Sequence, residues 1–231
     1  MKRLNLFLII LVSQSFLCQY QPKNLSNSDL RKANKWVDET YNALSQTERL
    51  GQLFIVAIYT NKDEAHISQI RNIVLNDKIG GLILMQDDAA REINLVNEFQ
   101  SKSKVPLMIG MDAEWGVFQR IAKAHKYPWA ITLGAVQDKN LIHDMAAKIA
   151  EDCKRMGINW DFAPVVDVNT NPNNPIIGNR SFGSDVNNVV NSALAYSNGL
   201  QDHKILAAIK HFPGHGDTDK DSHLDLPVVS H

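Results

Sequence analysis

The stretch ILAAI at residues 205–209, followed directly by KHFPGHGDTDKDSH at residues 210–223, determines how the rest of the chain is interpreted. The apolar run predicts a buried strand. One proline and two glycines within residues 213–216 then end any strand and predict a turning loop. The strand therefore delivers Lys210 and His211 at its C-terminal end, where parallel strands gather the groups that bind polar substrates.

The loop after this strand is rich in histidine and aspartate, and it also carries Asp217, Asp221 and His223. Two other interpretations of these residues stay open. A metal site is one, although the proline and glycine between His211 and His215 argue against a helix that would place both imidazoles on one face. A solvated loop that happens to be rich in these residue types is the other.

The composition is that of an ordinary globular protein. The 231 residues are 44% hydrophobic and 21% charged, and the length suits one large domain. The net charge of −1 gives no electrostatic reason to expect a nucleic-acid or membrane-surface partner.

The N-terminus predicts a secretory signal peptide over residues 1–20. A basic start precedes an apolar run at residues 4–12 that is too short to span a bilayer. A retained anchor or a buried first helix is the alternative. We therefore expect a secreted or periplasmic protein without stable membrane insertion after signal removal. A polar leader over residues 21–44 and a main domain over residues 45–231 complete the expected organisation.

The chain contains two cysteines, Cys18 and Cys153. Cys18 lies near the expected cleavage point, and a lipid anchor there is an alternative that the bulky Leu17 disfavours. If the signal is removed, a single thiol remains and no intrachain disulfide can form. Cys153 falls on the apolar face of a predicted helix, so we expect it to pack in the core.

The order of the predicted elements indicates parallel β/α units. Strands are expected to begin near residues 53, 80, 105, 158 and 205. Helices are expected over residues 28–41, 46–53, 65–75, 89–99, 140–156 and 186–200. A capping box from Ser45 to Glu48 and a C′ glycine at Gly157 mark two helix ends. Continuous apolar strands that alternate with helices are typical of a parallel sheet covered by helices.

Both a TIM-type (β/α)₈ barrel and a doubly wound sheet fit this alternation. The barrel is favoured because polar residues follow successive strands, and the carboxyl ends of barrel strands converge on one face. These pairs are Asp112 with Glu114, Asp167 with Asn169, and Lys210 with His211. No Gly-x-Gly-x-x-Gly turn follows the first strand, which argues against dinucleotide binding.

The motifs KHFPGHGDT at residues 210–218, DSH at 221–223 and LP at 226–227 resemble the signature of glycoside hydrolase family 3, in its β-N-acetylglucosaminidase (β-hexosaminidase) branch. The resemblance extends upstream from about residue 45 and implies a (β/α)₈ barrel. A full barrel needs about 250 residues and eight strands. With five strand candidates, we expect this α/β barrel to be incomplete and to need a C-terminal continuation that closes it.

The resemblance also implies a set of roles. His223 is the expected acid/base, held by Asp221, because a neighbouring carboxylate orients an imidazole and stabilises its protonated form. The family's nucleophile, an aspartate, is expected beyond the C-terminus, since no residue of this chain matches it. The expected substrate-binding residues are Asp112, Arg120, Arg180, Lys210 and His211. No metal or organic cofactor is expected.

Together these residues predict a retaining glycosidase that removes terminal β-linked N-acetylglucosamine from glycans, with peptidoglycan fragments as one candidate substrate. The fragment alone is expected to be inactive. A β-glucosidase or a glycoside phosphorylase of the same family is one alternative, and a non-catalytic sugar-binding remnant is another. Where the branch commonly carries Gly-Gly-Arg, this chain has Trp115-Gly116-Val117. Trp115 is expected either to stack on a sugar face or to fill core.

Overall fold

The computed structural model describes residues 26–229, which fall into two compact units divided in sequence between Ala43 and Leu44. The first unit holds α1 (Asn27–Ala43), which confirms the helix predicted over residues 28–41. The predicted signal peptide and Cys18 lie outside the described residues. No helix within residues 26–229 combines the length and the apolarity needed to cross a bilayer.

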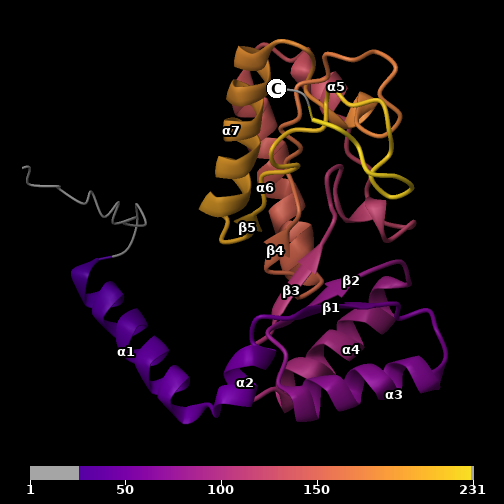
Figure 1. Ribbon diagram of the computed structural model, residues 1–231. Helices are drawn as coiled ribbons and strands as arrows, with labels where there is room; N and C mark the ends of the chain where they lie inside the picture. Colours follow the sequence, from indigo (N-terminus) through magenta and orange to yellow (C-terminus); the bar gives the residue numbers. More distant parts are fainter. Residues whose placement is uncertain (1–25, 230–231) are drawn as a thin grey trace, which may run out of the picture. The chain divides into compact units, whose positions relative to one another are not determined.

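The second unit is built on a sheet of five parallel strands (Figure 1). They are β1 (Ile55–Ile58), β2 (Gly81–Leu84), β3 (Met108–Met111), β4 (Trp160–Asp161) and β5 (Leu206–Ala207). The strand order β1-β2-β3-β4-β5 follows the sequence. A doubly wound sheet reverses its order at a switch point, whereas a barrel does not. The sequential order therefore agrees with the predicted TIM-type barrel, of which five strands are present.

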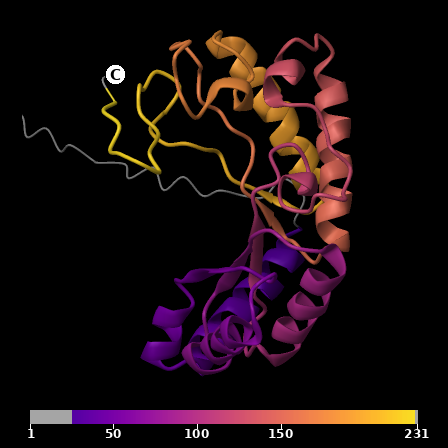
Figure 2. The same ribbon diagram turned by 90° about the vertical axis from the view of Figure 1, so that its right-hand side faces the viewer.

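Helices connect the strands. Helix α2 (Gln46–Gly51) precedes β1. The connecting helices are α3 (Glu64–Asn72) continued by the π-helical turn η1 (Ile73–Asp77), α4 (Ala89–Lys102), α5 (Ala130–Gly134), α6 (Lys139–Arg155) and α7 (Val186–Asp202). Two short 3₁₀ turns, η2 (Val117–Gln119) and η3 (Gly178–Arg180), lie in the loops after β3 and β4. Helices α6 and α7 pack side by side, and the segment that follows β5 extends to the opposite side of the unit (Figure 2).

Two helix ends are formed as the sequence predicts. The Ser45 hydroxyl accepts a hydrogen bond from the Glu48 N–H, and the Glu48 carboxylate accepts one from the Ser45 N–H. This reciprocal pair is the predicted capping box of α2. Gly157 follows α6 with a φ of +75°, a conformation that glycine adopts without strain, which confirms its C′ position.

The core lies between the sheet and the helices. Leu82, Ile109 and Met111 from the strands are buried with Ile142 of α6. Burying a side chain of this size stabilises the fold by about 1.5–3 kcal/mol. Cys153 on α6 is buried in the same core, as its position in the helix pattern predicts.

Two strands are shorter than the sequence predicts. Strands are expected to begin near residues 158 and 205, and the apolar run of the second extends to residue 209, but β4 and β5 contain two residues each. Beyond Asp161 the Ala208 N–H donates to two carbonyls instead of one, so the regular pairing ends there. Pro164 has no N–H with which to extend the ladder on its own strand.

The burial predicted for residues 205–209 is also wrong in part. Leu206 and Ile209 are 52% and 69% exposed in the described structure. β5 is the last strand of the described sheet, so these two side chains lie where no described element covers them. The apolar run at residues 205–209 thus predicted a strand, but it did not predict which of the side chains are buried.

Gly199 of α7 offers a test of the α6–α7 packing. A Cβ at this position would overlap the His143 carbonyl oxygen and come within 2.8 Å of the Ala146 Cβ. Replacing a helical glycine by alanine ordinarily stabilises by about 0.5–1 kcal/mol. We expect Gly199→Ala instead to lower the free energy of unfolding by roughly 1–3 kcal/mol, because the two helices must separate.

Urea unfolding followed by circular dichroism measures this difference. Asn198→Ala is the matched control, since Asn198 is exposed on the same helix and its replacement should leave the stability unchanged or raised. A Gly199→Ala variant as stable as the parent protein would contradict the close approach.

Candidate active site

Side chains from the ends of several strands line one cavity of about 610 Å³. Its lining residues are Asp112, Glu114, Gln119, Arg120, Phe162, Ile176, Arg180, Ala208, Lys210, His211, His215, Ser222 and His223. All five residues predicted to bind substrate belong to this set. His223 belongs to it as well, so the carboxylate at position 112 and the imidazole at position 223 share one cavity.

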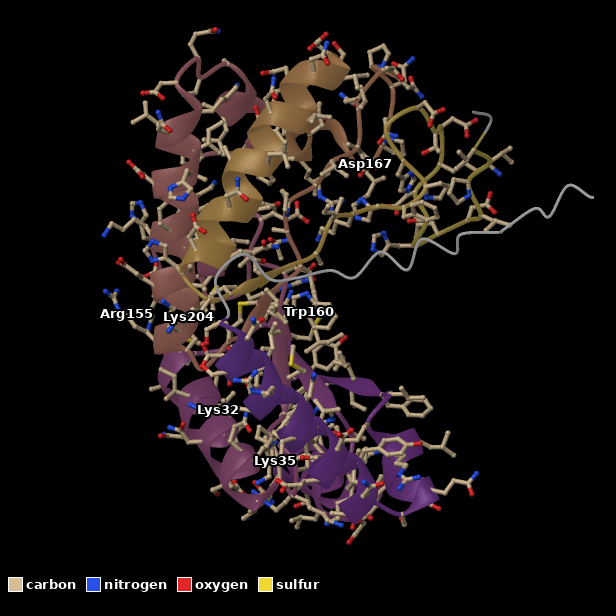
Figure 3. All side chains as sticks on the ribbon, turned by 90° about the vertical axis from the view of Figure 1, so that its left-hand side faces the viewer. Lys32, Lys35, Arg155, Trp160, Asp167 and Lys204 are labelled. Atoms are coloured by element: carbon tan, nitrogen blue, oxygen red, sulfur yellow. The ribbon has the colours of Figure 1, made fainter. Side chains whose placement is uncertain are left out.

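The cavity lies at the carboxyl ends of the strands. In Figure 3, Asp167, which follows β4, lies at the opposite end of the strands from Arg155 and Lys204, which precede β4 and β5. This is the end at which barrel enzymes build their active sites, because the loops after the strands converge there.

Lys210 joins two carboxylates that both follow β3. Its ammonium lies 2.8 Å from an oxygen of Asp112 and 2.8 Å from an oxygen of Glu114. Arg120 donates to the other oxygen of Asp112. Arg180 donates from Nε and Nη2 to the two oxygens of Glu114 at 2.9 and 2.7 Å, which is a bidentate pair.

The cations keep both carboxylates ionised. Burial alone would raise the pKa of Asp112, but Lys210 and then Arg120 outweigh it and hold that pKa below its ordinary value. For Glu114 burial is likewise overcome, by the hydrogen bond from Arg180 and the charge of Lys210, so its pKa is also lowered. The cavity wall therefore presents acceptor oxygens beside fixed cations.

His211 is held at both ring nitrogens. Its Nδ1 lies 2.6 Å from Oδ2 of the buried Asp167, and its Nε2 lies 3.3 Å from Nη2 of Arg180. A carboxylate only accepts and a guanidinium only donates, so this pairing assigns the ring proton to Nδ1. Asp167 also accepts from the His215 N–H at 2.7 Å, which ties the loop after β5 to the loop after β4.

Asp221 and His223 form a second imidazole–carboxylate pair, near the surface. Nδ1 of His223 lies 2.6 Å from Oδ1 of Asp221, and the same oxygen accepts from the His223 N–H at 2.9 Å. These two contacts, backbone first, lower the pKa of Asp221. The His223 side chain is 73% exposed. Asp221 therefore orients the His223 ring, while the ring remains open to solvent.

His215 supports the loop. Its Nδ1 contacts the Thr218 hydroxyl, and its Nε2 lies 3.2 Å from the Ser222 hydroxyl. The side-chain amide of Asn174 donates to the His215 carbonyl at 2.7 Å and to the Thr218 carbonyl at 2.9 Å. Within residues 26–229, no group of three or more histidine, cysteine, aspartate or glutamate side chains is arranged to hold a metal ion.

Sequence reasoning noted Glu114 and Asp167 only as polar residues after strands and gave them no role. Their positions after β3 and β4 were a usable signal, since Asp112, Lys210 and His211, which also follow strands, line the cavity. Trp115 stacks on Trp129, with ring centroids 4.0 Å apart, and does not belong to the cavity lining. Trp115 is half-buried and is not among the residues of the hydrophobic core, so neither of its two expected roles is observed.

A buried polar cluster lies behind Arg120. Glu92, in the first turn of α4, is fully buried, and neither of its oxygens has a hydrogen-bond partner among the described residues. Burial, and then the neighbouring Asp87 carboxylate, raise the pKa of Glu92 to about 8, against the attraction of Arg120. The carboxyl is therefore protonated at neutral pH.

Glu92 should make the stability fall as the pH rises. Its pKa is about 8 in the folded chain and 4.5 ordinarily, so unfolding releases its proton between these values. The stability that the protonated carboxyl gives is complete below pH 4.5 and lost by about pH 8. We expect Glu92→Gln, which cannot ionise, to be more stable than the parent at pH 9 by roughly 1–3 kcal/mol.

Denaturant midpoints at pH 5 and pH 9 test this, with Glu64→Gln as the control because Glu64 is an exposed first-turn glutamate of α3. Equal pH dependence of the parent and Glu92→Gln would rule out ionisation of a buried carboxyl.

Comparison with known proteins identifies the family to which the chain belongs. The glycosyl hydrolase family 3 N terminal domain matches residues 45–231. "Beta-hexosaminidase A" of Pseudoalteromonas piscicida is 38% identical over 176 residues, which are 71% of this chain and 29% of that protein.

Two solved structures are similar in fold. A family 3 beta-N-acetylglucosaminidase from Paenibacillus sp. superposes with a TM-score of 0.75 at 34% identity, over 82% of this chain and 37% of its own. A beta-glucoside phosphorylase, BglX, superposes with a TM-score of 0.79 at 28% identity, over 88% of this chain and 36% of its own. The chain thus spans about a third of the length of each relative. It belongs to glycosyl hydrolase family 3, and residues 45–231 are of the family's N-terminal domain type.

Proposed function

We propose that this chain provides the sugar-binding wall and the acid/base of a retaining glycosidase that removes terminal β-linked N-acetylglucosamine from glycans. One observation carries the proposal: Asp112, Lys210 and His223, which are far apart in sequence, line the same cavity. Its volume of about 610 Å³ falls in the range of small-molecule sites. The similarity to a beta-hexosaminidase and to a beta-N-acetylglucosaminidase supports the choice of sugar.

The sugar is held by acceptors and donors side by side. Each sugar hydroxyl both donates and accepts, so it is matched by a carboxylate with a cation beside it. Asp112 accepts from the hydroxyls, while Lys210 and Arg120 donate to their oxygens. Arg180, which donates to Glu114, and His211, which contacts Arg180, complete the binding set.

His223 is the proposed acid/base. Protonated, it gives its proton to the glycosidic oxygen as the bond to the anomeric carbon breaks, and it then takes a proton from the water that releases the sugar. Asp221 orients the ring throughout. A retaining reaction also needs a nucleophile that forms the covalent glycosyl intermediate, and we propose an aspartate for this role. The basic start and the apolar run at residues 4–12 support a secreted or periplasmic location.

A phosphorylase is the second candidate, and the similarity to a beta-glucoside phosphorylase favours it. A histidine acid/base becomes neutral when it has given up its proton, whereas a carboxylate would become anionic. A neutral ring repels an approaching phosphate less. Release of sugar 1-phosphate in phosphate buffer would identify this reaction.

The substrate can be tested with the protein expressed from its complete open reading frame. We expect hydrolysis of 4-nitrophenyl N-acetyl-β-glucosaminide with a kcat/KM at least about 10-fold above that for 4-nitrophenyl β-glucoside, since one well-matched polar contact gives that discrimination. The opposite preference would point to a β-glucosidase. Sugar binding without turnover of either compound would point to a non-catalytic remnant.

The role of His223 can be tested separately. General acid catalysis typically contributes about 10²–10⁴-fold, and it matters most for poor leaving groups. We expect His223→Ala to reduce cleavage of N-acetylglucosamine disaccharides by at least about 100-fold, and that of the activated 4-nitrophenyl substrate far less.

His203→Ala is the matched control, because His203 caps α7 and does not line the cavity. Equal losses on both kinds of substrate would contradict a proton-donating role for His223.

A further inference from the structure

The peptide groups between Asp112 and Glu114 are hydrogen-bonded by two side chains that do not line the cavity. Ala113 separates Asp112 from Glu114 and is fully buried. Its N–H donates to Oδ1 of Asp161 at 3.0 Å, and its carbonyl accepts from the Tyr196 hydroxyl at 3.3 Å. The same hydroxyl lies 3.2 Å from the Glu114 carbonyl. We call Asp161 and Tyr196, with these three contacts, the Ala113 clamp.

Both members of the clamp are buried polar side chains, and the backbone of Ala113 and Glu114 is their main hydrogen-bonding target. Asp161 ends β4 and is fully buried, and its second oxygen has no hydrogen-bond partner among residues 26–229. Tyr196 projects from α7 and is 1% exposed. Neither belongs to the cavity lining. Buried polar groups are costly unless they are paired, so their one shared target, the 113–114 backbone, is informative.

The geometry also links the clamp to the charges of the cavity. Burial, opposed by the Ala113 N–H and by Lys210, raises the pKa of Asp161 to about 7, and Glu114 and Asp112 add to the rise. Burial raises the pKa of Tyr196 as well, so its hydroxyl stays protonated and remains a donor. Asp161 thus lies within electrostatic reach of the groups whose backbone it holds.

We propose that Asp161 and Tyr196 are positioning residues that fix the Asp112 and Glu114 carboxylates at the sugar-binding wall. Asp161 holds the N–H of the peptide group between Asp112 and Ala113, and Tyr196 holds the carbonyl of the peptide group between Ala113 and Glu114. A rotation of either peptide group would move the carboxylate beside it. Small misplacements of binding groups are costly in enzymes. The inference rests on the proposed function in so far as the wall binds a sugar.

The test uses the protein from the complete open reading frame and 4-nitrophenyl N-acetyl-β-glucosaminide. Tyr196→Phe keeps the ring and removes the donor, Asp161→Ala removes the acceptor, and Asp161→Asn keeps an acceptor oxygen. Ser192→Ala is the control, since Ser192 is a buried residue of α7 whose hydroxyl has no partner among the described residues.

We expect Tyr196→Phe to raise KM about 5- to 10-fold, the effect of one lost hydrogen bond. Asp161→Asn should recover most of what Asp161→Ala loses, and Ser192→Ala should stay within about twofold of the parent. A KM unchanged in Tyr196→Phe would overturn the proposal, as would equal effects of Tyr196→Phe and Ser192→Ala. These two variants decide it even if Asp161→Ala fails to fold.

Amide hydrogen exchange separates this inference from the proposed function, because it needs no substrate. In Tyr196→Phe the Ala113 and Glu114 amides should exchange faster than in the parent and in Ser192→Ala. If the parent turns over no glycoside, the proposed function fails while faster exchange still supports the clamp. Unchanged exchange at both amides would overturn the clamp whatever the substrate.

Discussion

The site depends on the Lys210 ammonium, which lies 2.8 Å from both Asp112 and Glu114. Two carboxylates this close in a partly buried wall repel each other, and burial opposes the ionisation of both. In the sheet β4 lies between β3 and β5. Lys210, which follows β5, therefore reaches across the end of β4 to the two carboxylates that follow β3. Arg120 pairs in addition with Asp112, and Arg180 pairs with Glu114. Removing the lysine would leave the half-buried Asp112 and the buried Glu114 each with one cation fewer, and breaking a buried ion pair is strongly destabilising.

The two carboxylates have different amounts of acceptor capacity left. A carboxylate has about four acceptor positions. Asp112 uses two of them, for Lys210 and Arg120, and Glu114 uses three, for Lys210 and the two nitrogens of Arg180. Asp112 therefore keeps more room for sugar hydroxyls, whereas Glu114 mainly holds the cations in place. This division supports Asp112 as the proposed sugar acceptor.

Local chemistry was readable from the sequence, and distant contacts were not. The Ser45 capping box and the Gly157 helix end were predicted because each is decided within four residues. The strand starts followed from apolar runs. The short lengths of β4 and β5 could not be read, because they depend on which carbonyls the Ala208 N–H meets. The motifs identified Asp112, Arg120, Arg180, Lys210, His211 and His223, which all line the cavity. The contact between Tyr196 and Glu114 could not be predicted, because 82 residues separate them.

The structure also contains two histidine–aspartate pairs with similar contacts but different surroundings. In both, Nδ1 lies 2.6 Å from a carboxylate oxygen. Asp167 is fully buried and Arg180 occupies Nε2 of His211, so that ring has no nitrogen left for a proton transfer. The His223 ring is open to solvent, with Asp221 at Nδ1 only. Proton exchange with a substrate oxygen and then with water requires a nitrogen that both can reach. Surroundings rather than residue type therefore assign binding to His211 and acid/base chemistry to His223 in the proposed reaction.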